Sequence, residues 1–243
     1  MPKTTLDKSS RIIIGFCIFS IILSLTALLL GYIFSLIDSK KTVAEPLPPP
    51  FTVVIDAGHG GLDGGATAID GTKEKDLNLL VALSLGEMLK LNGYNVIYTR
   101  TEDIMLTMND SNGSAKMQDL KKRVEIANYE DNSLFISIHM NKFSQEKYCG
   151  LQVFYSGSNP KSEKIANLIQ ANTKNMLQEN NNRETKKAGS NIYLLHKTKV
   201  PAVLVECGFL SNPEECELLK NDGYRKEIAA VIYSSVIEFF EQT

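Results

Sequence analysis

Hydrophobic positions divide the chain into two unequal parts. Residues 12–37 form one apolar run without a charged side chain, and a proline-rich stretch follows it. Beyond residue 50, short apolar runs alternate with stretches whose apolar residues recur at helical spacing. This alternation predicts strands and helices in turn, and therefore a single α/β domain over residues 51–243.

The elements of this domain are predicted from the period of its apolar residues. Runs rich in β-branched residues predict strands, and apolar residues three or four positions apart predict helices. The predicted strands are Thr52–Ile55, Asn95–Thr99, Leu134–Ile138, Leu151–Tyr155, Ile192–Leu195 and Ala202–Val205. The predicted helices are Lys75–Leu91, Leu120–Tyr129, Lys161–Leu177, a short helix from Pro213, and Tyr224–Phe240. The polar stretches Thr101–Gly113 and Glu179–Ser190 predict loops.

The N-terminal apolar run predicts a membrane anchor. Residues 12–37 are long enough to cross a hydrocarbon core of about 30 Å as a helix, whereas a cleavable signal peptide has an apolar region of about 7–15 residues. We therefore expect a transmembrane signal anchor, with residues 1–11 in the cytoplasm and the domain outside it. Residues 38–50 predict a stiff linker. Thr42–Ala44 leaves signal cleavage and secretion open, and a buried core helix fits poorly because the run is apolar on every side.

Composition and charge limit the class of protein and of partner, but they do not indicate a function. The chain is 43% hydrophobic and 22% charged, which is typical of a globular protein, and its net charge of −2 gives no reason to expect a nucleic-acid partner. After the apolar run come Cys149, Cys207 and Cys216, without CxxC spacing. This pattern indicates neither a disulfide framework nor a thiolate zinc site. One disulfide stays open as an alternative to small buried or partly exposed thiols.

Candidate catalytic and metal-binding residues follow the ends of predicted strands. His59 follows the first strand through a glycine-rich turn, His139 follows the third, and Glu206 follows Ala202–Val205. In open α/β sheets the carboxyl ends of the strands form the ligand crevice, so we expect these three side chains to converge. Glu74 is a fourth candidate, because it begins the helix after the glycine turn and a helix N-terminus favours a carboxylate.

Two imidazoles and a carboxylate are ligands typical of an open, catalytic zinc site, and a second carboxylate nearby would act as general base. Glu74 and Glu206 are both available for these two roles. Three polar residues could fix a histidine tautomer or the substrate, namely Asp56, Asp63 and Asn141. The simpler alternative makes each histidine a turn or core residue, but the coincidence at several strand ends favours a site.

Other motifs explain the same residues less well. In a dinucleotide-binding loop the third glycine would fall at position 63, where the chain has Asp63, whose carboxylate would face a pyrophosphate. A P-loop is excluded because no Gly-Lys-Ser/Thr follows, and the HExxH helix of other zinc hydrolases is absent. We interpret His196 as a surface residue at a strand end, with a substrate contact left open.

Four ordered blocks carry a resemblance to a known family. They are IDAGHGGLDGGA (Ile55–Ala66), KEKDLNL (Lys73–Leu79), FISIHMN (Phe135–Asn141) and PAVLVECGFLSNPEE (Pro201–Glu215). From about Thr52 to Phe240 the sequence resembles the zinc-dependent N-acetylmuramoyl-L-alanine amidases. The resemblance implies zinc held by three residues, with a fourth as catalytic base: His59, Glu74 and His139 as ligands and Glu206 as base. It also implies a mixed, mostly parallel sheet of about six strands flanked by helices.

The reaction implied is hydrolysis of the amide between N-acetylmuramic acid and L-alanine in peptidoglycan. An anchor followed by a bare catalytic domain is similar to the sporulation amidases, which implies action on the spore cortex, muramic δ-lactam formation, a role in germination, and a location between the forespore and mother-cell membranes. Because no wall-binding repeat is visible, we expect an accessory protein. The alternatives are a zinc peptidase or deacetylase on another cell-wall amide, and a catalytically silent wall regulator, which would not need Glu206.

Overall fold

The computed structural model describes residues 18–32, 51–107 and 115–242. The chain divides into two units, Met1–Pro48 and Pro49–Thr243. In the first unit, residues 18–32 form a helix, while the predicted anchor over residues 12–37 runs past both of its ends into residues outside the described ranges. Among the described residues, no helix combines the length and apolarity needed to cross a membrane. The predicted linker and residues 1–11 also lie outside the described part.

The second unit is the predicted α/β domain. Its strands are β1 (Thr52–Ala57), β2 (Asn95–Tyr98), β3 (Ser133–Asn141), β4 (Gln152–Tyr155), β5 (Lys186–Lys187) and β6 (Ala202–Phe209). Its helices are α2 (Glu74–Leu91), α3 (Ala115–Ala127), α4 (Lys161–Met176), α5 (Tyr193–Lys197), α6 (Pro213–Lys220) and α7 (Asp222–Glu241). The strands form one sheet in the order β2-β1-β3-β6-β4-β5, parallel throughout except between β4 and β6. The prediction of a mostly parallel sheet of about six strands is confirmed.

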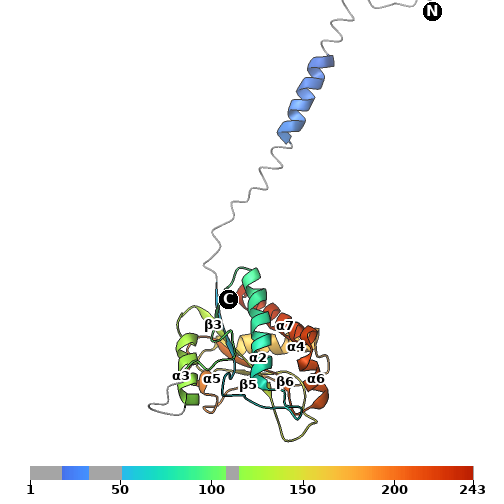
Figure 1. Ribbon diagram of the computed structural model, residues 1–243. Coiled ribbons are helices and arrows are strands. Elements are labelled where there is room, and N and C mark those ends of the chain that lie inside the picture. Colours follow the sequence, from blue (N-terminus) through green and yellow to red (C-terminus); the bar gives the residue numbers. More distant parts are fainter. Residues whose placement is uncertain (1–17, 33–50, 108–114, 243) are drawn as a thin grey trace, which may run out of the picture. The chain divides into compact units, whose positions relative to one another are not determined.

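Helices cover both faces of this sheet, with α2, α4 and α7 on one side and α3 and α5 on the other (Figure 1). The larger core lies under α2, α4 and α7, where every second residue of β1, β3 and β6 is buried and apolar, as with Val53, Ile136 and Val205. On the opposite face, the same strands change from apolar side chains such as Val54 and Leu204 to Asp56, His139 and Glu206 near their carboxyl ends. The sheet therefore carries its polar chemistry on the α3/α5 face.

Several predicted boundaries need correction. Residues 192–195 were expected to be a strand, but Tyr193–Lys197 is the helix α5, which places Leu194 and Leu195 in the core under that face. A short apolar run does not distinguish the two structures. Helix α3 begins at Ala115, earlier than predicted, and the predicted loop Glu179–Ser190 contains β5. Strands β3 and β6 run through His139 and Glu206 instead of ending before them, because these residues pair with each other in the ladder.

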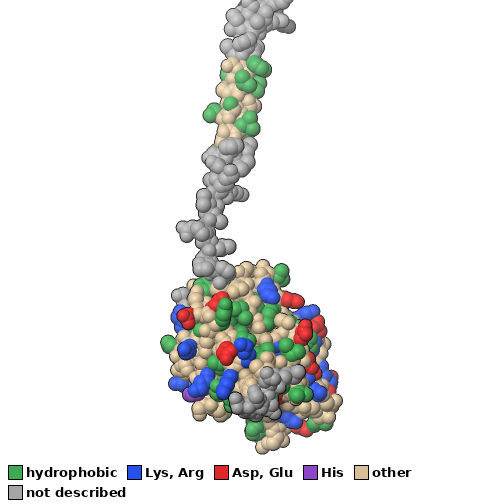
Figure 2. All heavy atoms as spheres, turned by 60° about the vertical axis from the view of Figure 1, so that its left-hand side comes forward, with side chains coloured by type: hydrophobic (Ala, Val, Ile, Leu, Met, Phe, Trp, Pro, Cys, Tyr) green, Lys and Arg blue, Asp and Glu red, His purple; other side chains and the backbone are tan. Residues whose placement is uncertain are grey.

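The outer surface of the domain has a mixed character. Figure 2 shows Lys and Arg side chains beside Asp and Glu side chains, with apolar side chains among them. The cysteines of the domain are free, with Cys207 and Cys216 buried and Cys149 exposed, as the simpler interpretation predicts. The groups that set this domain apart lie instead at the carboxyl edge of its sheet, where Glu74 is buried and His59, His139 and Glu206 are half-buried.

Candidate metal and catalytic site

The turn after β1 brings His59 to the carboxyl edge of the sheet. His59 has a φ of 63°, and it is the one residue other than glycine with positive φ in the described part of the chain. The backbone of this turn passes directly beside the next histidine, since a Cβ added at Gly58 would lie 2.3 Å from Nε2 of His139. Glycine is therefore required at position 58 by close packing against His139.

The loop that follows holds Glu74 in place at the start of α2. The helix has no side-chain N-cap, and loop carbonyls replace it, because the Glu74 amide donates to the Ala66 carbonyl at 2.9 Å. The Ala66 amide in turn donates to Oε2 of Glu74 at 2.7 Å. A Cβ added at Gly65 would lie 2.5 Å from that oxygen, so only glycine lets the loop close over the carboxylate.

The three predicted ligands meet at this point. Nε2 of His59 lies 3.3 Å from Oε1 of Glu74, and Nδ1 of His139 lies 2.9 Å from the same oxygen. One ligand atom from each residue can be chosen so that all three lie within 4.8 Å of one another, which makes the group able to hold a metal ion. Nδ1 of His59 faces Oδ2 of Asp63 at 2.9 Å, so Asp63 occupies one ring nitrogen and leaves the other directed at Glu74.

Glu206 lies directly beside these ligands. It pairs with His139 across β3 and β6, and both line a pocket of about 270 Å³ together with His59. Its Oε2 is buried without a hydrogen-bond partner among the described residues. An unpaired buried acceptor costs about 1–3 kcal/mol, so it is a feature that packing alone does not favour. It is the kind of group that a general base presents to a substrate.

The two glutamates of the site differ in protonation. Burial acts to raise the pKa of Glu74, but hydrogen bonds from His139 and His59 outweigh it and hold that pKa well below its usual range. Burial raises the pKa of Glu206 to about 7, with His139 opposing the shift and the charge of Glu74 adding to it. Burial tends to lower the pKa of His59, yet Glu74 and Asp63 together raise it. Glu74 is thus a permanent anion, whereas Glu206 can exchange a proton near neutral pH.

The supporting residues predicted from the sequence take different positions. Asp63 contacts His59, as expected of a group that fixes a tautomer. Asp56 is fully buried and bonds to Ser137, Thr99 and Arg123 instead of to either histidine. Asn141 ends β3, where its carbonyl accepts from the Leu210 amide. His196 is exposed on α5, which corrects its predicted place at a strand end.

Three buried residues beside the site were given no role by the sequence analysis. Asn78, one turn after Glu74 on α2, donates to the Gly58 carbonyl at 3.1 Å. Arg100 and Arg123 are buried beside the same turn and donate to its carbonyls. For Arg123 a signal exists in the sequence: it lies four residues after Asp119 and one before Val124, on the side of α3 that faces the sheet, where a charged residue needs partners.

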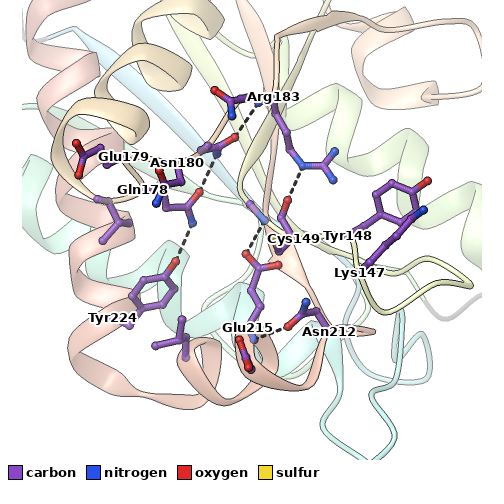
Figure 3. Close-up of a pocket in the computed structure, with 16 residues that line it drawn as sticks. Lys147, Tyr148, Cys149, Gln178, Glu179, Asn180, Arg183, Asn212, Glu215 and Tyr224 are labelled. Carbon is purple, nitrogen blue, oxygen red and sulfur yellow. Dashed lines mark hydrogen bonds between the residues drawn. The ribbon is translucent and has the colours of Figure 1, made fainter.

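A second, larger hollow of about 650 Å³ lies beside the start of β4 and α6 (Figure 3). Its walls are bonded to each other: Nε2 of Gln178 donates to the Tyr224 hydroxyl, and Glu215 accepts from the amides of Gly150 and Phe209. None of the buried, unpaired side-chain atoms found among the described residues belongs to it. The smaller pocket, and not this one, contains His59, His139 and the unpaired oxygen of Glu206.

The fold and the site together define a class of protein. The sequence profile of the N-acetylmuramoyl-L-alanine amidase family matches residues 53–238. This match begins at β1, ends within α7 and includes the three candidate ligands and Glu206. The chain therefore belongs to the N-acetylmuramoyl-L-alanine amidases, enzymes of the bacterial cell wall.

Individual relatives show which amidases within the family this chain is similar to. The germination-specific N-acetylmuramoyl-L-alanine amidase of Bacillus subtilis (strain 168) is 38% identical over 218 residues, covering 88% of this chain and 90% of the relative. A solved structure of the CwlD amidase from Clostridioides difficile, in complex with the GerS lipoprotein, is 40% identical with a TM-score of 0.75, covering 79% of this chain and 99% of that one. The predicted similarity to sporulation amidases is confirmed.

A more distant structure carries the same fold. The N-acetylmuramoyl-L-alanine amidase from Clostridium difficile 630 is 27% identical with a TM-score of 0.69, covering 80% of this chain and 98% of that one.

Proposed function

We propose that this domain hydrolyses the amide bond between N-acetylmuramic acid and L-alanine in peptidoglycan, and that it does so with zinc. The observation that carries the proposal is the unpaired, buried Oε2 of Glu206 beside the His59–Glu74–His139 group. A general base next to three potential metal ligands is the arrangement that metal-assisted hydrolysis requires. Membership of the amidase family supplies the bond that is cleaved.

The donor set supports zinc as the metal. Two imidazoles and one carboxylate form a three-ligand set of nitrogen and oxygen donors, which in catalytic zinc sites leaves a position for water or substrate. Zinc, when bound, lowers the pKa of a water molecule toward neutrality and polarises the scissile carbonyl. The protein fixes the ligands in advance, since Asp63 orients His59 and the amide of Met140 donates to Oε1 of Glu74 at 3.1 Å.

Glu206 then moves the protons of the reaction. Its unpaired oxygen accepts a proton from the attacking water as the oxygen of that water adds to the amide carbon. The same carboxyl returns the proton to the alanine nitrogen as the C–N bond breaks, so that a lactyl carboxylate and a free amine result. Because its pKa is raised toward 7 by burial, the protonated form needed for the second transfer is accessible near neutral pH.

The test is a product analysis of digested peptidoglycan by mass spectrometry. We expect intact stem peptides with a free L-alanine amine and glycan strands without peptides, with activity lost on chelation and restored by zinc. A zinc peptidase would leave L-alanine on the glycan, a deacetylase would release acetate and leave the peptides attached, and a silent wall protein would change nothing. Any of these three outcomes contradicts the proposal.

The spore cortex is the proposed site of action. Similarity to the germination-specific amidase of Bacillus subtilis supports a role in germination and a location outside the cytoplasm. The location between the forespore and mother-cell membranes is part of the same proposal. Removal of stem peptides would expose muramic acid for δ-lactam formation. Spores that lack the protein should therefore contain cortex without muramic δ-lactam, and a normal δ-lactam content would contradict the cortex role.

An accessory lipoprotein is the proposed partner. Support comes from the CwlD amidase of Clostridioides difficile, whose structure was solved in complex with the GerS lipoprotein. If the purified domain alone binds zinc tightly and has full activity on cortex fragments, no such partner is needed for catalysis.

A membrane anchor over residues 12–37 is proposed from the uncharged apolar run alone. Fractionation of cells that express the full chain, or the chain without residues 12–37, tests it. We expect only the full chain to stay with the membrane after a high-salt wash.

A further inference from the structure

Two arginines outside every motif are buried against the metal-binding turn. Arg100 follows β2 and is 3% exposed, whereas Arg123 lies on α3 and is 1% exposed. Buried arginines need hydrogen-bond partners, and both find them in the turn Ala57–Gly58–His59. We name this pair of side chains the arginine clamp.

The clamp binds three consecutive backbone carbonyls of the turn. Nε of Arg100 donates to the Ala57 carbonyl at 2.8 Å, and its Nη2 donates to the Gly58 carbonyl at 3.0 Å. Nη1 of Arg123 also donates to the Ala57 carbonyl at 2.8 Å, and its Nη2 donates to the His59 carbonyl at 2.7 Å. Each carbonyl is thus held by a charged donor, which makes a stronger hydrogen bond than a neutral one.

The turn needs such support because its conformation is unfavourable. A left-handed conformation is unfavourable for a residue other than glycine, and His59 adopts it with a φ of 63°. Gly60 and Gly61, which follow, also have positive φ and gain more freedom than other residues when released. With its carbonyls fixed toward the arginines, the turn directs the His59 imidazole at Glu74.

The two arginines of the clamp differ in how neighbouring charges affect their pKa. Burial tends to lower the pKa of Arg123, but Asp56 and Asp119 raise it and so keep this arginine charged. Burial lowers the pKa of Arg100, and the nearby charge of Arg123 lowers it further. All four hydrogen bonds of Arg100 among the described residues go to carbonyl oxygens, including those of Lys75 and Glu102. Two like charges buried together do not favour stability by themselves.

From this geometry we infer that Arg100 and Arg123 are positioning residues for the metal site. They preset the backbone of the His59 turn, so that metal binding does not have to order it. The inference rests on the proposed function of His59, Glu74 and His139 as zinc ligands. Neither guanidinium is a ligand, and a purely structural role would affect folding without a specific effect on the metal.

The test compares Arg100→Lys and Arg123→Lys with Arg225→Lys as a matched control. Lysine keeps the charge but loses the forked geometry that reaches two carbonyls at once. Arg225 is also buried and also donates to a backbone carbonyl, that of Leu219, but it lies on α7 away from the site. Each folded variant is assayed for zinc affinity by competition with a chromophoric chelator, for the visible absorption of bound Co²⁺, and for thermal unfolding without metal.

We expect the two clamp variants to bind zinc about 10–100-fold more weakly and to show an altered Co²⁺ spectrum, as losing a partner of a metal ligand typically does. Arg225→Lys should lose thermal stability while its zinc affinity and Co²⁺ spectrum stay those of the wild type. If Arg123→Lys does not fold, Arg100→Lys alone tests the inference. Replacing Arg100 removes hydrogen bonds to carbonyls but leaves the ion pairs of Arg123 with Asp56 and Asp119 intact.

Clamp variants with wild-type zinc affinity and spectrum would overturn the inference and leave the metal site standing. A wild-type protein that binds no zinc would overturn the proposed metal site, and the inference with it. The two failures are distinguished by the wild-type measurement alone.

Discussion

Two hollows lie at the carboxyl edge of the same sheet, and each contains a glutamate from the same block of sequence, Glu206 half-buried and Glu215 buried. The smaller, of about 270 Å³, contains Glu206, whose Oε2 has no partner among the described residues. The larger, of about 650 Å³, contains Glu215, whose two oxygens accept from the amides of Gly150 and Phe209. Among the described residues, the smaller hollow thus presents an unpaired acceptor and the larger one does not, and this difference, not size, supports the smaller hollow as the proposed site.

Burial raises the pKa of both carboxyl groups, but different neighbours oppose the shift in the two cases. For Glu206 burial raises the pKa to about 7, and the histidine charges beside it oppose the shift. For Glu215 burial also raises the pKa, while the two amide donors work in the opposite direction. Glu215 thus ties the segment before β4 to Phe209 at the end of β6, as a structural support near the proposed base.

The most drastic way to break this comparison is to remove a metal ligand from the smaller hollow. His139→Ala should reduce bound zinc from about one ion per chain to almost none, because two protein ligands do not complete a catalytic zinc site. Elemental analysis of the purified protein measures this. His196→Ala is the matched control, since His196 is exposed on α5 and should leave the zinc content unchanged. Full zinc occupancy in His139→Ala would refute the assignment.

The next largest effect is expected from the base itself. Glu206→Gln keeps the shape of the side chain but cannot accept the proton of water, so kcat should fall by about 10²–10⁴-fold. Zinc content and the thermal stability of the zinc-loaded protein should be retained, since Oε2 of Glu206 has no hydrogen-bond partner among the described residues. Turnover of peptidoglycan at the wild-type rate would show that another group is the base.

The corresponding substitution in the larger hollow, Glu215→Gln, should reduce stability and leave activity unchanged. Glu215→Gln replaces one acceptor oxygen by an amide donor, so that either the Gly150 or the Phe209 amide loses its partner. We expect a loss of about 1–3 kcal/mol in the free energy of unfolding, measured by urea denaturation. Zinc content and the order of magnitude of kcat should not change.

Its control is Glu214→Gln, the exposed neighbour on α6, which should be neutral in the same assays. A stable Glu215→Gln variant that has lost its activity would place Glu215 in the chemistry and erase the difference between the two hollows.

Sequence patterns were sufficient to predict that the candidate ligands lie close together, but not to predict the residues that hold them in place. His59, His139 and Glu206 follow apolar runs that predict parallel strands, and parallel strands bring their carboxyl ends to one edge. The end of the predicted strands was wrong at His139 and Glu206, because a polar residue in a buried ladder ends the apolar pattern without ending the strand.

The clamp was missed for a different reason. Arg123 and its partner Asp56 are 67 positions apart, and a single arginine on a helix is usually solvated, so only the fold brings this pair together. The unpaired oxygen of Glu206 likewise depends on which neighbours the chain places around it. Residue types and spacing therefore predict the reactive groups, whereas their protonation and support follow from tertiary contacts.

The pH dependence of stability tests Glu206 without any measurement of catalysis, and its effect per pH unit is the smallest expected. In metal-free protein the pKa of Glu206 rises on folding from its ordinary value of 4.5 to about 7. Between these values the native state holds more protons than the unfolded state, so this group makes stability fall as pH rises from about 4.5 to 7, and has no effect below 4.5. Glu206→Gln removes this titration. We therefore expect its stability relative to the wild type to increase with pH in this window, by at most about 1.4 kcal/mol per pH unit.

Urea denaturation of both proteins in chelator at a series of pH values measures the difference. A difference that does not change between pH 4.5 and 7 would mean that Glu206 is not held protonated by burial.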